Sequence, residues 1–240
     1  MVAIWVVAEL FPLIPSLDVS TVVNNIKSLW QQDPWQPRRT FEHIGMTLIG
    51  LDALAHLLRS ATADRFVKPL AVVATLAMLA GKFLILGQSP GLAVPAGIAG
   101  GALLWWYVDR IPEKTRLPTL LAIFTTTYLV YALAPYELQE FPTSMQWMPF
   151  ASALQGSIEA VLTSVAFEAL CFGAIIWSSV RMGALPAGTT LSVAVLAFGC
   201  EWVQRYLPGR TAEISSVLTA LVMGWLVAVL GQSRRHKHLP

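Results

Sequence analysis

The sequence predicts an all-α fold: a bundle of seven transmembrane helices, or eight if an N-terminal apolar segment also spans. Hydrophobic residues make up 55% of the 240 residues and charged residues 12%, and the mean hydropathy is +0.61. These values of hydrophobic content and mean hydropathy lie outside the range of water-soluble domains of this length. Several apolar runs have the roughly 20 residues that cross a bilayer core, and short polar segments separate them. One helical bundle in lipid follows from these observations.

The first part of the chain, residues 1–40, combines a short apolar segment with a polar stretch. The apolar segment runs for roughly 14 residues and contains Pro12, with Pro15 directly after it, which is short for a span. Two interpretations stay open, a tilted or shortened transmembrane helix and an interfacial segment. Residues 16–40 are rich in Asn, Gln, Asp and Pro and are expected to form an external polar loop.

The expected spans fall into two groups, four in residues 41–134 and three in residues 135–231. Pro and Gly mark several of the turns between them, where helices are interrupted at the interface. The loop 135–156 mixes carboxylates, prolines and aromatic residues, which suits a re-entrant or amphipathic interfacial element. The spans are expected at residues 41–58, 66–86, 90–108, 117–134, 157–180, 187–206 and 214–231.

The distribution of basic residues predicts the orientation. If the basic tail 232–240 lies inside, the alternation of spans puts ten basic residues on its side and five on the other. Cytoplasmic loops are enriched in Lys and Arg, so the C-terminus is expected to be cytoplasmic. The loops 135–156 and 206–213 then face outward.

Ionisable residues inside the expected spans need a partner or a function, since each costs roughly 2.5–3.5 kcal/mol at the centre of a span. Glu168 lies near the middle of its span. Asp52 and His56 are one helical turn apart, and a locally satisfied polar pair is favoured over a proton relay. The spacing supplies no third ligand, so neither a metal site nor a cofactor is expected.

The densest polar group lies around the last interhelical loop, and it has two interpretations. One is an ion pair within a helix, together with side chains that snorkel to the interface. The other is a pocket, because a Pro-Gly turn that presents an arginine at the start of a helix suits a phosphate or carboxylate headgroup. Lys82 also approaches the external end of its span and is expected to add charge to the same site. The group consists of Glu201, Gln204, Arg205, Arg210 and Glu213.

Other features concern partners. Gly97 and Gly101 have the small-residue spacing that lets transmembrane helices approach closely, either within the chain or with a membrane protein partner or second protomer. Cys171 and Cys200 fall inside apolar runs and suggest neither a disulfide framework nor a metal site. The net charge of +2 and the dispersed basic residues make a nucleic-acid partner unexpected.

A motif in the C-terminal third points to a family. In residues 201–231 a glutamate and a glutamine three residues later precede a proline-containing turn, an arginine, an acidic residue and a glycine-bearing last span. This order resembles the signature of the VanZ-like membrane proteins, with Glu201, Gln204, Arg210 and Glu213 at its positions. The upstream loop resembles the family's Pro-aromatic segment, and the resemblance covers about residues 130–231. Its residues there are Pro135, Tyr136, Pro149 and Phe150.

The chain also departs from the family pattern. Where the family usually shows an aspartate and then an asparagine after the arginine, this chain has Ser216 and Ala220. Met223 stands at a usual glycine. The resemblance implies an envelope protein of the bacterial cytoplasmic membrane, in a family linked to low-level glycopeptide-antibiotic resistance without a settled reaction.

Three functional hypotheses follow. The leading one is a non-enzymatic bundle that binds an anionic lipid or a lipid-linked glycan at the outer leaflet. Arg210 and Lys82 would supply charge, and Glu201, Gln204 and Glu213 would supply hydrogen bonds. The second is an intramembrane enzyme or transporter acting on a polyprenyl-type lipid, with Glu168 as proton carrier. The third is a structural subunit of a larger membrane protein complex.

Overall fold

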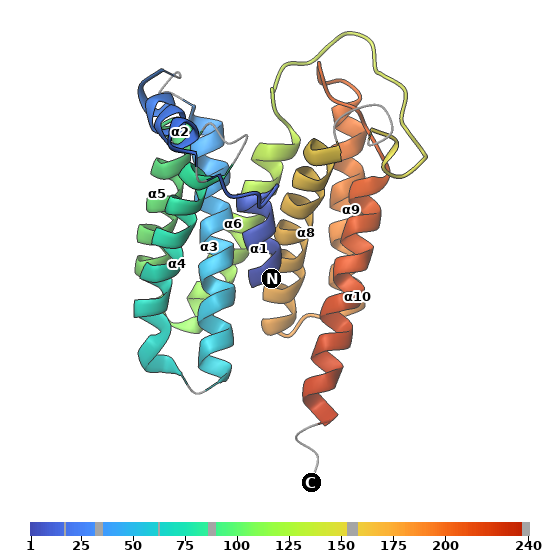
Figure 1. Cartoon of the computed structure of the whole chain (residues 1–240). Coiled ribbons are helices and arrows are strands. Elements are labelled where there is room, and N and C mark those ends of the chain that lie inside the picture. The colour runs from blue at the N-terminus through green and yellow to red at the C-terminus, as the bar shows by residue number, and fades with distance from the viewer. Residues whose placement is uncertain (17, 32–35, 62, 86–89, 153–157, 237–240) are drawn as a thin grey trace. The chain divides into compact units, whose positions relative to one another are not determined.

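The structure is a computed structural model that describes the chain except for residues 17, 32–35, 62, 86–89, 153–157 and 237–240. The described residues are helical, apart from loops and two isolated bridges (Figure 1). Two compact units divide the chain, unit 1 from Met1 to Arg116 and unit 2 from Leu117 to Pro240. The helices are α1 (Val2–Leu10), α2 (Val19–Gln31), α3 (Pro37–Ser60), α4 (Asp64–Leu84), α5 (Ala93–Val108), α6 (Glu113–Ala132), α8 (Ile158–Arg181), α9 (Pro186–Gln204) and α10 (Ser215–His236).

Each of the seven apolar runs coincides with a helix, from α3 to α10. Three helices, α4, α8 and α9, are long and apolar enough to cross a membrane by length and composition, fewer than the seven expected. The others fall short for local reasons. The central part of α3 carries His43, Asp52 and His56, α6 begins with a charged turn, and α5 and the apolar part of α10 are shorter. The fold is therefore compatible with an integral membrane protein.

Apolar side chains lie on the surface of these long helices. Val73 and Leu76 of α4 are 58% and 59% exposed, and Leu191 and Val195 of α9 are both 64% exposed. Soluble monomers rarely expose contiguous apolar surface of this kind, which is typical of a face that contacts membrane or another protein.

The segment 16–40 differs from the expected polar loop, because it contains α2. Apolar residues recur on α2 at the spacing of one helical face, and all of them are exposed. The polar residues Asn25 and Ser28 are buried instead, and Asn25 donates a hydrogen bond of 3.0 Å to the carbonyl of Phe83 near the end of α4. The apolar face of α2 therefore points away from the other helices of unit 1. Its exposed residues are Val19, Val23, Ile26 and Trp30.

Glycines set the closest helix contacts in unit 1. A Cβ at Gly97 would lie 2.6 Å from the carbonyl oxygen of Thr40, and one at Gly101 would lie 2.7 Å from that of Ile44. Both carbonyls belong to α3, so this small-residue face packs against another helix of the same chain. A contact with a second protomer through Gly97 and Gly101 gains no support from this packing.

The helix α1 is packed by a second close approach. Trp5 is fully buried and lies on Gly50 of α3, where a Cβ would come within 1.9 Å of the indole ring. The nine residues of α1 are too few to cross a bilayer core along its normal, at about 1.5 Å of rise per residue. The N-terminal segment, for which two interpretations were open, therefore contains a short helix that packs on α3 and α4.

Gly50→Ala is expected to lower the free energy of unfolding by about 1–3 kcal/mol, because the added methyl group overlaps the Trp5 ring. The matched control is Gly199→Ala in α9, where a Cβ would have nothing within 4 Å. There the helix preference of Ala predicts no loss, or a gain of up to about 1 kcal/mol. Unfolding in mixed micelles measures both variants, and equal stability of the two would contradict this packing.

In unit 2, α8, α9 and α10 pack together, and the loop after α6 crosses their ends (Figure 1). Its backbone pairs with the turn between α9 and α10: Gln139 and Thr143 donate to the carbonyls of Tyr206 and Arg205, both at 2.8 Å. Gln146 donates to Ala212 at 2.9 Å and accepts from Ile214 at 3.1 Å. The described part of the loop is thus mostly non-helical, apart from helical backbone at residues 151–152, and residues 153–156 lie outside the described residues.

The C-terminal tail also differs from expectation. The helix α10 continues to His236, so the first part of the basic tail 232–240 is helical. Residues 237–240 lie outside the described residues.

Candidate functional site

Polar side chains from both ends of unit 2's sequence meet in one pocket with a volume of about 100 Å³. The end of α6, the loop that follows it, α8, α9 and the start of α10 all contribute to its wall. The pocket brings together four residues of the predicted site with Glu168, which comes from a separate helix. Its polar lining residues are Ser152, Ser164, Glu168, Glu201, Gln204, Arg210, Thr211, Glu213, Ser215 and Ser216.

Two of the carboxylates hold the backbone around the pocket. Glu201 is 3% exposed and accepts hydrogen bonds from the backbone N–H of Glu213, at 2.8 Å, and from the hydroxyl of Ser216. The carboxylate of Glu213 accepts from the N–H of Ser152 at 2.7 Å and from the hydroxyl of Ser215 at 2.9 Å. Each carboxylate thus joins segments that are separate in sequence, and together they shape the pocket.

Ser216 lies between two carboxyl groups. Its hydroxyl is 3.0 Å from an oxygen of Glu168 and also contacts Glu201. A hydroxyl has one proton to donate, so both contacts are hydrogen bonds only if one of the two carboxyl groups also carries a proton. The arrangement allows a proton to pass between Glu168, Ser216 and Glu201. The serine that departs from the family pattern is therefore part of the site.

Arg210 makes two backbone contacts that the sequence did not predict. Its Nε donates to the carbonyl of Ala134 at 2.9 Å, its Nη2 donates to the carbonyl of Tyr131, and the guanidinium lies 5.2 Å from the Tyr131 ring centre. The arginine therefore clamps the end of α6, and only part of its donor capacity faces the pocket. Gly209 precedes it with φ +71°, a conformation that glycine adopts without strain.

The alternative of an ion pair within α9 is wrong. The carboxylate of Glu201 accepts from Glu213 and Ser216, whereas Arg205 donates to the carbonyl of Thr143 at 3.0 Å and stacks on Trp202 at 4.4 Å. Arg205 thus fixes the loop at the outside of the site.

Gln204 is one of the polar groups that line the pocket and can bind a ligand. It is 7% exposed and lines the pocket, and within the described part of the chain its carboxamide makes no hydrogen bond. A carboxamide both donates and accepts, so it can bind a hydroxyl group. The pocket also contains three carboxyl groups and one guanidinium, a balance that favours hydrogen-bond donors over an isolated anion.

Lys82 belongs to a second buried polar cluster, in unit 1. Its Nζ lies 3.0 Å from Oε2 of Glu9 and also donates to the backbone carbonyl of Glu9. His43 places Nδ1 3.0 Å from the same carboxylate oxygen, and Glu9 is 1% exposed. The expected contribution of Lys82 to the pocket of unit 2 is replaced by this ion pair. Sequence reasoning missed the cluster, although a glutamate inside an apolar stretch already required a cationic partner.

Asp52 also lies near a charged residue, Arg116, which the sequence spacing of Asp52 and His56 did not predict. It is buried, and Arg116 Nη2 lies 4.0 Å from its Oδ1. Arg116 and Arg59 both contact Asp109, at 3.1 Å and 2.8 Å, so Asp52 adjoins a charged network. Among the described residues, no group of three or more His, Cys, Asp or Glu side chains is arranged to hold a metal ion.

No family model matches the chain, and neither a curated protein nor a solved structure matches it. The resemblance to VanZ-like proteins stays a prediction carried by the motif residues.

Proposed function

We propose that this chain is an integral membrane protein that binds the polar head of an envelope lipid in the pocket of unit 2. The observation that carries the proposal is the gathering of five polar side chains around one cavity of unit 2: Glu168, Glu201, Gln204, Arg210 and Glu213. Burying so many polar groups is costly unless they are paired or serve a ligand. In this proposal the protein is a VanZ-like envelope protein that binds without catalysing a reaction.

The chemistry of the lining favours a lipid-linked glycan over a simple anionic lipid. Sugar hydroxyls can donate to Glu168 and exchange hydrogen bonds with Gln204, while Arg210 offers one charged contact for a phosphate. Three carboxyl groups would repel a head that carries negative charge alone. The cavity of about 100 Å³ is smaller than the roughly 300–1,000 Å³ of whole-ligand pockets, so it suits part of a head group.

The proposed membrane arrangement keeps the seven spans from α3 to α10, with the C-terminus in the bacterial cytoplasm. The helices α4, α8 and α9 support it by length and composition. The exposed apolar face of α2 suits a helix that lies in the membrane interface. In this arrangement the pocket opens toward the outer leaflet.

Gln204→Leu tests the proposal, because it removes the available carboxamide and breaks no hydrogen bond within the described part of the chain. The protein is purified in mild detergent, and native mass spectrometry identifies the lipids that stay bound. We expect the wild type to retain a glycosylated lipid and the variant to retain about tenfold less, the effect of one lost buried hydrogen bond. Their melting temperatures should agree within a few degrees.

Gln31→Leu is the matched control, since Gln31 ends α2 in unit 1 and is exposed. It should retain lipid like the wild type. Equal retention by Gln204→Leu would contradict the proposal. If the lipid whose retention depends on Gln204 were purely anionic and carried no sugar, the preference for a glycan would be wrong.

A second candidate function, proton-coupled turnover or transport of a polyprenyl-type lipid, is favoured by the contact of Ser216 with Glu168 and Glu201. A proton shared between carboxyl groups in a pocket is the arrangement that a proton carrier needs. Glu168→Gln would then abolish lipid-dependent proton flux in proteoliposomes. Glu159→Gln, an exposed position on the same helix, would leave the flux unchanged.

A further inference from the structure

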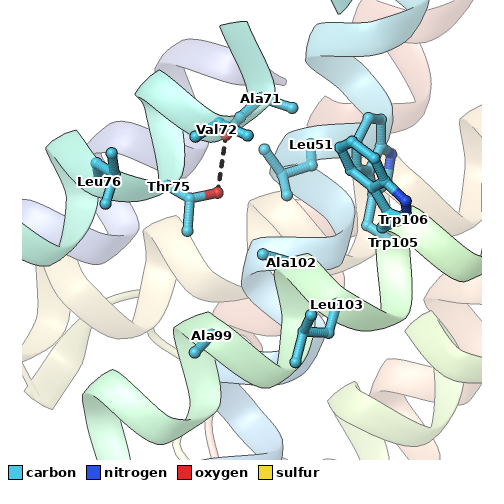
Figure 2. Close-up of a pocket in the computed structure, with 10 residues that line it drawn as sticks. All are labelled: Leu51, Ala71, Val72, Thr75, Leu76, Ala99, Ala102, Leu103, Trp105 and Trp106. Atoms are coloured by element: carbon cyan, nitrogen blue, oxygen red, sulfur yellow. Dashed lines mark hydrogen bonds between the residues drawn. The ribbon is translucent and has the colours of Figure 1, made fainter. Parts of the chain in front are cut away.

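A groove on unit 1 has a surface suited to a hydrocarbon chain (Figure 2). It lies among α3, α4 and α5, has a volume of about 340 Å³, and includes Leu51, Leu76, Ala102 and Trp106 in its lining. Its one hydroxyl, Thr75, donates a hydrogen bond of 2.8 Å to the carbonyl of Ala71 on its own helix. The groove therefore presents hydrocarbon and aromatic ring surface to whatever occupies it.

One end of the groove adjoins a basic cluster. Lys68 places its Nζ 5.1 Å from the centre of the Trp106 ring, and the guanidinium of Arg110 lies 5.8 Å from the same ring. A second cavity, about 490 Å³ in volume, is lined by three cations, two carboxylates and one apolar residue: Arg59, Arg65, Lys68, Asp64, Asp109 and Val67. Val67 lines this cavity and Ala71, one helical turn later on α4, lines the groove, so the two cavities are neighbours along α4.

The charges at this end do not cancel. Arg59 contacts Asp109 at 2.8 Å and Asp64 at 3.7 Å, and Arg116 adds a second cation to Asp109. Within the part of the chain that the structure describes, three further cations form no ion pair. These are Arg65, Lys68 and Arg110, all exposed.

We propose that this groove and its basic end bind one anionic phospholipid, with an acyl chain along α4 and α5 and the phosphate between Lys68 and Arg110. The apolar groove matches the chain, the cations match the phosphate, and Trp106 lies where the two parts of the lipid would join. The outward-facing side chains of Val72, Leu76 and Leu103 are exposed, so lipid has access. This site shares no residue with the pocket of unit 2 and is independent of the function proposed for it.

The orientation expected from the basic residues places this end at the cytoplasmic leaflet, whose anionic lipids attract Lys and Arg. A lipid held there would fill the space among three helices of unit 1. The occupant is thus a structural lipid with a charge preference, rather than the ligand of the polar pocket.

The test uses the full chain in bilayers that contain brominated phosphatidylglycerol or brominated phosphatidylcholine, since bromine quenches a tryptophan that it touches. The difference between the wild type and Trp106→Phe isolates the signal of Trp106. We expect phosphatidylglycerol to be preferred at this site by roughly fivefold or more, and the preference to fall in high salt. The double variant Lys68→Gln/Arg110→Gln should bring the preference close to one, while Lys114→Gln, an exposed cation outside both cavities, should preserve it.

A groove-filling variant, Ala102→Leu, distinguishes an acyl chain bound in the groove from a lipid that is attracted only by the surface charges. It should reduce quenching of Trp106 by both brominated lipids, with the fold retained. Equal quenching by the two lipids in the wild type would overturn the proposal, as would a preference that survives in the double variant. Undiminished quenching in Ala102→Leu would overturn the placement of the acyl chain.

Discussion

Lys82→Met is expected to lower the free energy of unfolding by about 3–5 kcal/mol, the usual effect of removing one partner of a buried ion pair. The Nζ of Lys82 lies 3.0 Å from the Glu9 carboxylate, and both side chains are buried. Met has a similar length and no charge, so the variant keeps most of the packing and leaves Glu9 with His43 alone. The transition is followed by circular dichroism in mixed micelles with increasing denaturing detergent.

Two further variants show whether the loss comes from the pair. The double variant Glu9→Gln/Lys82→Met should be more stable than the sum of the two single losses predicts, because it removes the carboxylate that Lys82→Met leaves behind. Lys114→Met changes an exposed cation and should shift stability by less than about 0.5 kcal/mol. A loss below about 1 kcal/mol in Lys82→Met would show that the cluster does not hold α1 against α3 and α4.

Glu201→Ala is expected to cost a similar amount, about 3–5 kcal/mol, because hydrogen bonds to a charged group contribute roughly 1.5–3 kcal/mol each and this carboxylate accepts two. The N–H of Glu213 would lose its acceptor in a buried place, and the hydroxyl of Ser216 would keep only its contact with Glu168. Since Glu213 in turn holds Ser152, the loop over the pocket should loosen as well. Lipid retention in native mass spectrometry should then fall together with stability.

A graded series separates the hydrogen bonds from the bulk of the side chain. Glu201→Gln keeps one acceptor oxygen and nearly the same volume, so it should lose about half as much stability as Glu201→Ala. Glu159→Ala, at an exposed position of α8, should be close to the wild type. If Glu201→Gln and Glu201→Ala were equally destabilised, the acceptor role assigned to the carboxylate would be wrong.

Apolar periodicity and length were enough to predict the helices. The seven runs from 41 to 231 each coincide with a helix, because a helix satisfies the backbone hydrogen bonds of a long, mostly apolar segment within that segment. The same reasoning missed α2, whose polar composition suggested a loop. Its signal was the recurrence of Val19, Val23, Ile26 and Trp30 on one helical face, which composition alone hides.

The site was predictable in part. Glu201, Gln204, Arg210 and Glu213 are close in sequence, so a short turn between two helices necessarily keeps them near one another. Glu168 joined the site only through the packing of α8 against α10, which brings it to the hydroxyl of Ser216. Lys82 was expected to belong to the site because it lies near the end of a predicted span. In the structure it forms an ion pair with Glu9, which is more than seventy residues away in sequence.

By itself, the sequence determined the all-helical class, the positions of the apolar helices and the local cluster around the last turn, because these depend on neighbours within a few residues. Only the tertiary structure decided the partners of the buried charges: Lys82 with Glu9, Asp52 near Arg116, and Ser216 between two glutamates. A buried charge must find its partner within about 4 Å in space. Distance along the chain places no limit on where that partner comes from.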